Sequence, residues 1–132
     1  MSIIAQDWIA HHARISPAQE AIHDLASGRR FTFAEFDIRV TRLALYLQSL
    51  GVGESDRVAV LSHNDSDVFE IQFACARLGA IFLPLNWRLA VAELEYISRD
   101  ATPKVMLYGV EFAEDALKVV QLAGIEHSVD LA

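Results

Sequence analysis

The segment from Asp56 to Arg88 constrains the fold more than any other part of the sequence, because it predicts a strand, a helix and a second strand joined by short connections. Arg57 to Leu61 is a β-branched, apolar run of the kind found in strands that are buried on both faces of a parallel sheet. Ile81 to Leu85 is a second apolar run. We therefore expect Val58 to Leu61 and Ile81 to Leu83 to be central, parallel strands, with the intervening helix across one face.

The helix between these runs, Asp67 to Leu78, is predicted to bury most of its circumference. Asp65 or Ser66 can accept a hydrogen bond from a free amide of its first turn. Gly79 tolerates the left-handed conformation that often ends a helix. Two apolar rows at helical spacing are expected to be buried: Val68, Ile71, Cys75 and Leu78, and beside them Phe69, Phe73 and Ala76.

Residues 1–32 are predicted to form a helix and a small antiparallel hairpin, ahead of an α/β unit at residues 33–132. The helix is expected at Ile4 to Arg14, because the proline that follows disfavours helical geometry in the residue before it. The hairpin is expected to pair Ala21 to Asp24 with Arg30 to Thr32 around a glycine-bearing connection.

Thr32 and Glu35 form a capping-box pattern, in which each side chain accepts a hydrogen bond from the other residue's backbone amide. The helix that follows has a regular apolar stripe. We expect Glu35 and Arg39, four positions apart, to pair on its other side. The stripe consists of Phe36, Val40, Leu43, Leu47 and Leu50.

The remainder of the chain repeats the alternation of helices and strands. Helical faces are predicted at residues 90–101 and 112–123, a third buried strand at Lys104 to Tyr108, and one more strand at Ile125 to Leu131. The fold class is therefore α/β, with a mainly parallel sheet, helices on both faces and a small N-terminal β-hairpin. The last residues give no capping or closing signal, so we expect the chain to stop in mid-architecture.

Composition excludes several classes of protein. The chain has 132 residues, a net charge of −7 and 11 scattered basic residues, so no basic stripe is available for nucleic acid. No apolar run approaches the roughly 20 residues of a transmembrane helix, and the start does not read as a signal peptide. The single cysteine, Cys75, gives no disulfide framework. We therefore expect a soluble, cytoplasmic protein.

Most familiar catalytic patterns are absent. The sequence has no G-x-G-x-x-G, G-x-x-x-x-G-K-[ST], G-x-S-x-G or H-E-x-x-H pattern, and its five histidines lack metal-ligand spacing. Cys75 is expected to be an inert core residue. Asp65 and Asp67 follow a strand, where a phosphoacceptor or ion ligand can lie, but helix capping explains them more simply. Arg88 follows the second strand and is either an anion contact or a solvated loop residue.

Three segments of the sequence are distinctive in their order and spacing: Phe31-Thr32-Phe33-Ala34-Glu35-Phe36, Gly53-Glu54-Ser55-Asp56-Arg57-Val58-Ala59-Val60-Leu61 and Gly79-Ala80-Ile81-Phe82-Leu83-Pro84-Leu85-Asn86. Together they resemble the beginning of the AMP-forming acyl-CoA synthetase superfamily, whose members include adenylation domains. The segments Arg88-Leu89 and Glu93 to Ile97 also fit that family. Asn86 and Trp87 are more similar to ligases of fatty or aromatic acids than to amino-acid-activating domains.

The resemblance implies a parent enzyme that converts a carboxylic acid, ATP and coenzyme A into acyl-CoA, AMP and pyrophosphate, with Mg²⁺. The family's phosphate loop, nucleotide motifs and C-terminal lid normally come after the region matched here. The resemblance therefore assigns no catalytic residue and no metal ligand, and this chain alone is expected to bind neither ATP, Mg²⁺ nor coenzyme A. Only Arg88 matches a position near which some relatives contact a coenzyme A phosphate.

Three interpretations follow from the sequence. The chain is the N-terminal part of the large domain of such a synthetase, or a stand-alone interaction or regulatory module on the same scaffold. Without the resemblance, it is a small flavodoxin-like or receiver-like binding module, with Asp65 near the strand end as its reactive group. In the first case, apolar faces that lack their packing partners are expected to cause self-association.

Overall fold

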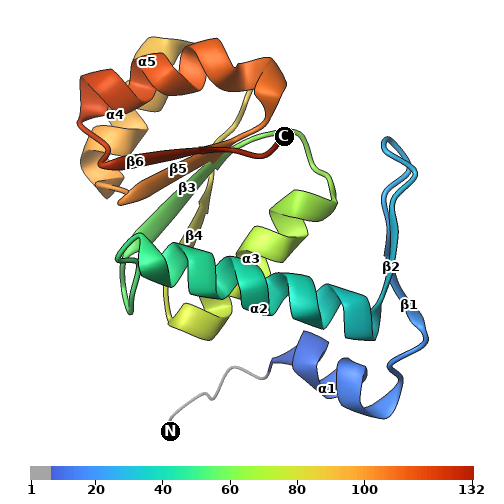
Figure 1. The fold of residues 1–132 in the computed structure, drawn as a ribbon. Helices are drawn as coiled ribbons and strands as arrows, with labels where there is room; N and C mark the ends of the chain where they lie inside the picture. Colours follow the sequence, from blue (N-terminus) through green and yellow to red (C-terminus); the bar gives the residue numbers. More distant parts are fainter. Residues whose placement is uncertain (1–6) are drawn as a thin grey trace, which may run out of the picture.

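The computed structural model describes residues 7–132, which form a parallel sheet with helices on both faces and a separate antiparallel hairpin (Figure 1). The helices are α1 (Trp8–Ile15), α2 (Phe33–Ser49), α3 (Ser66–Leu78), α4 (Val91–Ala101) and α5 (Ala113–Ala123), with a 3₁₀ turn η1 (Val110–Phe112) before α5. The strands are β1 (Glu20–His23), β2 (Arg30–Thr32), β3 (Arg57–Leu61), β4 (Ile81–Pro84), β5 (Val105–Tyr108) and β6 (His127–Asp130). The predicted α/β class, parallel sheet and N-terminal hairpin are confirmed.

The sheet has the order β4-β3-β5-β6, and its strands separate two apolar cores. Successive side chains of a strand point to opposite faces, so β3 and β5 contribute to both cores. The first core combines Val58, Val60, Val105 and Leu107 with buried residues of α2 and α3. The second combines Ala59, Leu61, Met106 and Tyr108 with buried residues of α4 and α5. Within residues 7–132, no helix is both long enough and apolar enough to cross a bilayer.

The predicted position of the second apolar strand within the sheet was wrong. Ile81 to Leu83 does pair in parallel with β3, as expected, but β4 lies at the edge of the sheet. Its first residue, Ile81, is 46% exposed, and the central strands are β3 and β5. An apolar run in the sequence shows that a strand has an apolar environment, but it does not show whether a strand pairs on one side or on both.

The prediction for α3 is confirmed at both ends and for its burial, except that part of the second apolar row is exposed. Asp65 caps its start by accepting from the Val68 amide at 3.1 Å, and Gly79 ends it with a φ of 66°. Ile71 and Cys75 are fully buried, and only Phe69, Gln72 and Ala76 are exposed, so the helix buries most of its circumference, as predicted. The first apolar row packs against the sheet and α2, and part of the second row faces solvent.

The N-terminal elements differ slightly from their predicted bounds. The helix expected from Ile4 to Arg14 is α1, which begins at Trp8 because Asp7 caps it by accepting from the Ala10 amide at 3.0 Å. Ile4 lies outside the described residues. The first hairpin strand is Glu20–His23 rather than Ala21 to Asp24, because Asp24 leaves the strand and caps the turn.

The capping box at the start of α2 is confirmed. The Thr32 hydroxyl accepts from the Glu35 amide at 3.2 Å, and the Glu35 carboxylate accepts from the Thr32 amide at 2.8 Å. This second bond also explains why the predicted Glu35–Arg39 pair was wrong, since Glu35 is turned back toward the end of the hairpin. Arg39 instead contacts Glu70 and Asp67 on α3.

Replacing Thr32 by alanine is expected to lower the free energy of unfolding by about 1 kcal/mol, because an amide in the first turn of α2 loses its partner. Urea denaturation followed by circular dichroism measures the change. Thr32→Ser keeps the hydroxyl and is the matched control, for which we expect a midpoint close to that of the original chain. Equal midpoints for all three proteins would contradict the role of the cap.

Candidate functional site

The loops after β3, β4 and β5 meet at the carboxyl-terminal edge of the sheet, the side on which its parallel strands end. They meet because parallel strands that lie side by side place their carboxyl ends together. In open α/β sheets, this edge is where ligands bind. The side chains that meet there form the edge cluster. It consists of His63 after β3, Trp87 and Arg88 after β4, and Glu111 and Phe112 after β5.

Arg88 lies at the exposed end of this cluster. Its backbone amide donates to Asn86 Oδ1 at 3.0 Å, which closes a tight turn after β4. Its Cζ atom is 4.3 Å from the centroid of the Trp87 ring, the geometry of a cation–π contact. No carboxylate within residues 7–132 forms an ion pair with the guanidinium, so its donors face solvent. The geometry therefore leaves Arg88 available to an anion.

A cavity of about 290 Å³ opens beside Arg88. Its walls come from the ends of β3 and β4 and from the first turn of α3, and they include the polar side chains of Ser62, Asn64 and Asn86. Trp87 forms part of the wall as well. The cavity and Arg88 together make this edge the candidate functional site.

His63 was not recognised as a site residue from the sequence. Its Nδ1 atom lies 2.9 Å from Glu111 Oε1, and its ring meets the Trp87 and Phe112 rings edge-on, with centroid distances of 4.6 and 4.8 Å. A signal was present, because His63 follows an apolar strand as closely as Arg88 does. Extending the strand-end argument to all three strands would have brought His63, Arg88 and Glu111 together.

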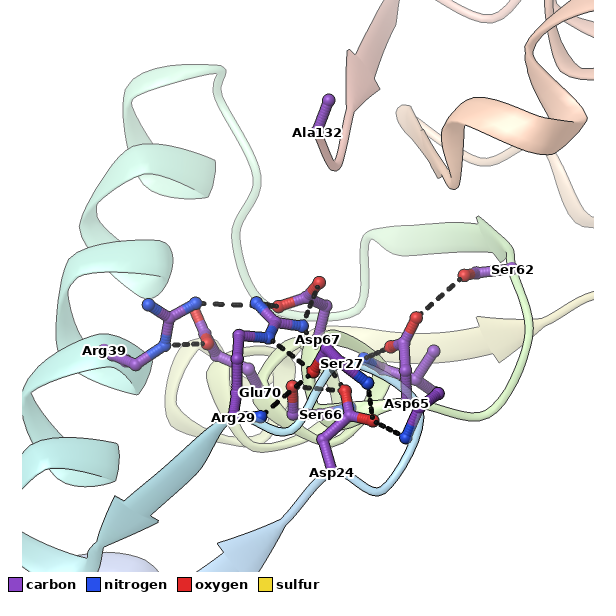
Figure 2. A network of polar contacts seen from close by, with 12 residues as sticks. Asp24, Ser27, Arg29, Arg39, Ser62, Asp65, Ser66, Asp67, Glu70 and Ala132 are labelled. Atoms are coloured by element: carbon purple, nitrogen blue, oxygen red, sulfur yellow. Dashed lines mark hydrogen bonds and ion pairs between the residues drawn. The ribbon is translucent and has the colours of Figure 1, made fainter.

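A second polar cluster, the hairpin network, joins the hairpin to α2 and α3 (Figure 2). It consists of Asp24, Arg29, Arg39, Asp67 and Glu70. Arg29 donates to both carboxylate oxygens of Asp67, at 3.1 and 2.9 Å, and Arg39 Nε donates to Glu70 at 2.7 Å. Both arginines of this network face carboxylates. The network therefore has a structural role, which is to hold the hairpin against α2 and α3.

Two carboxyl groups of the hairpin network have shifted pKa values. Hydrogen bonds from Ser27, and further amide bonds from Ser66 and Ala26, hold the pKa of Asp24 well below its usual range. Burial raises the pKa of Glu70, although Arg39 opposes the shift. Asp24 also accepts from the Ser66 hydroxyl at 3.2 Å, which ties the hairpin turn to the start of α3.

The aspartates considered from the sequence have structural partners. Asp65 caps α3, as the simpler interpretation held, and Asp67 is held by Arg29 and Arg39. Burial raises the pKa of the Cys75 thiol to about 12, which agrees with the expectation of an inert core cysteine. Among the described residues, no three His, Cys, Asp or Glu side chains converge as a metal site.

The sequence from residue 9 to residue 131 matches the family described as AMP-binding enzyme. The chain belongs to the AMP-binding enzyme family. It is 41% identical over 107 residues to a feruloyl-CoA synthase of an Amycolatopsis species, a match that covers 81% of this chain and 21% of that protein. It is 36% identical over 126 residues to an indoleacetate–CoA ligase of Aromatoleum aromaticum, covering 91% of this chain and 24% of the ligase.

Solved structures of AMP-binding enzymes share the fold. The inhibitor-bound N-terminal domain of FACL13 from Mycobacterium tuberculosis superposes with a TM-score of 0.87 at 28% identity, over 94% of this chain and 32% of that one. A putative long-chain-fatty-acid CoA ligase from Rhodopseudomonas palustris superposes with a TM-score of 0.87 at 32% identity, over 94% of this chain and 31% of that one. The chain thus spans 21% to 24% of the curated relatives named above. This member of the AMP-binding enzyme family therefore resembles an N-terminal part of acyl-CoA synthetases.

Proposed function

We propose that this chain is the N-terminal part of the large domain of an ATP-dependent acyl-CoA ligase. The ligase would convert a carboxylic acid, ATP and coenzyme A into acyl-CoA, AMP and pyrophosphate. The observation that carries the proposal is the match over nearly the whole chain to relatives whose names describe CoA ligation. Asn86 and Trp87, together with the acids in those names, favour an aromatic or fatty acid as the substrate class.

Of the three substrates of this reaction, the residues of this chain fit only coenzyme A. The sequence has no glycine-rich phosphate loop, and residues 7–132 hold no cluster of metal-binding carboxylates, so no binding of ATP or Mg²⁺ is assigned to them. Arg88 does fit an anion, because it is exposed, has no ion-pair partner among residues 7–132 and stacks on Trp87. We assign it to a phosphate of coenzyme A. The free, buried Cys75 supports a reducing, cytoplasmic location.

A segment exchange tests the proposed function. In the Amycolatopsis feruloyl-CoA synthase, the matching N-terminal segment is replaced by residues 9–131 of this chain, and the formation of feruloyl-CoA is measured. We expect a folded, active chimera, whereas the synthase without its segment should be inactive. A chimera that unfolds cooperatively but makes no acyl-CoA would contradict the proposal and favour a stand-alone module.

In a full-length ligase that carries this chain, Arg88→Ala is expected to raise the apparent KM for coenzyme A about tenfold, because a charge-assisted bond to phosphate is lost. The rate of adenylate formation, followed by pyrophosphate exchange, should change little, since coenzyme A enters after that step. Arg42→Ala removes another exposed arginine, on α2, and is the matched control. An unchanged KM in Arg88→Ala would make Arg88 an ordinary surface residue.

A further inference from the structure

Glu111 is folded back over the backbone of Gly109, and its carboxylate occupies the space that a side chain at residue 109 would need. A Cβ atom at residue 109 would lie 2.9 Å from Glu111 Oε2 and 3.1 Å from Ser62 Oγ, which is closer than side chains normally approach. The other oxygen of Glu111 is 2.9 Å from His63 Nδ1. The loop after β5 is therefore shaped so that the Glu111 carboxylate reaches His63 on the loop after β3.

His63 in turn contacts Trp87 on the loop after β4. Its ring meets the Trp87 indole at a centroid distance of 4.6 Å and an interplanar angle of 77°, a favourable edge-to-face geometry. Phe112 supports His63 from the other loop, with centroids 4.8 Å apart. Arg88 in turn rests on the Trp87 ring. The contacts thus run from Glu111 through His63 and Trp87 to Arg88.

We propose that His63, held by Glu111, is a positioning residue that fixes the Trp87 ring and thereby the guanidinium of Arg88. An arginine that is already held in its binding geometry loses less side-chain freedom when an anion arrives, so its affinity is higher. The exposed His63 ring, at a side-chain exposure of 52%, contributes through Trp87 and not through burial in a core. Only the identity of the anion, a coenzyme A phosphate, rests on the proposed function.

The first test uses the 132-residue chain itself. Trp8→Phe leaves Trp87 as the single tryptophan, and acrylamide quenching then reports how freely Trp87 moves and meets solvent. We expect His63→Ala and Gly109→Ala to raise the quenching constant, and His63→Phe, which retains an aromatic ring, to restore it for the most part. His127→Ala is the matched control, because His127 also lies beside a glutamate, Glu126 at 3.5 Å. Unchanged quenching in His63→Ala, with the circular dichroism spectrum intact, would overturn the proposal.

The second test uses a full-length ligase that carries the chain. His63→Ala is expected to raise the apparent KM for coenzyme A about 2-fold to 10-fold, the range that an edge-to-face aromatic contact corresponds to, without slowing adenylate formation. This effect should disappear in an Arg88→Ala background. An effect of the same size in both backgrounds would overturn the positioning role. If Arg88→Ala leaves the KM unchanged, the coenzyme A assignment fails, and the quenching result alone decides whether His63 positions Trp87.

Discussion

Assayed alone, the 132-residue chain is expected to produce no acyl-adenylate and no exchange of pyrophosphate into ATP. Adenylyl transfer needs preorganised donors and a cation around the phosphates, where negative charge develops. Losing a single such donor typically slows a reaction by about 10²-fold to 10³-fold, so a chain without the whole set should show no measurable rate. The net charge of −7 also disfavours the approach of ATP.

The measurement is radioactive pyrophosphate exchange with the purified chain and a panel of aromatic and fatty acids. The active chimera described above is the positive control, because it contains the same residues 9–131 in a complete ligase. Exchange above background that disappears when the chain is denatured would show that residues 1–132 contain a nucleotide site of their own. That result would contradict the assignment of ATP chemistry to the rest of the ligase.

Replacing Arg77 by alanine is expected to lower the free energy of unfolding by about 2–3 kcal/mol, because several charge-assisted hydrogen bonds are lost together. Arg77 lies on α3 and is only 17% exposed. It donates to Asp7 at the start of α1 at 2.7 Å, and on α2 it donates to the Asp37 carboxylate and to the Thr41 hydroxyl, the latter at 2.6 Å. One guanidinium thus joins three helices.

Guanidinium chloride denaturation measures the loss, and Lys118→Ala is the control. Lys118 also pairs with a carboxylate, Glu114 at 2.7 Å, but the pair is exposed and lies within one helix, so its removal should barely shift the midpoint. If the two variants are equally stable, the contacts of Arg77 with α1 and α2 contribute no more to stability than an exposed ion pair.

The effect of Arg77→Ala should depend on pH. Burial favours the neutral form of Asp7, but the Ala10 amide and Arg77 outweigh burial and hold its pKa below the ordinary value of 3.8. A carboxyl group with a lowered pKa in the folded state stabilises the fold above its unfolded pKa and loses that contribution as the pH falls through the folded value. The stability difference between Arg77→Ala and the original chain should therefore shrink below pH 3.8.

The parts of the fold that depend on local sequence could be predicted. The Thr32–Glu35 capping box, the cap at Asp65 and the left-handed Gly79 each involve residues a few positions apart, so their chemistry is visible in the sequence. The apolar run of β3 was equally clear, because both of its faces are buried. Such features account for the α/β class and the order of its elements.

Features that depend on distant residues could not be predicted in the same way. Arg39 had an apparent partner four positions away, yet its partner in the structure is Glu70, 31 positions along the chain. The edge position of β4 depends on which strands pair, and the sequence does not state this. At the candidate site, Arg88 was found because it follows a strand, whereas the link from His63 to Glu111 spans 48 positions.

The sheet divides the interior into two cores, so a substitution in one core first affects the packing of that core. A larger side chain beneath α5 strains the second core first, because α2 and α3 pack on the other face of β3 and β5. The loops of the edge cluster leave from the paired strands themselves, so the hydrogen bonds between β3, β4 and β5 set the spacing of His63, Trp87 and Glu111.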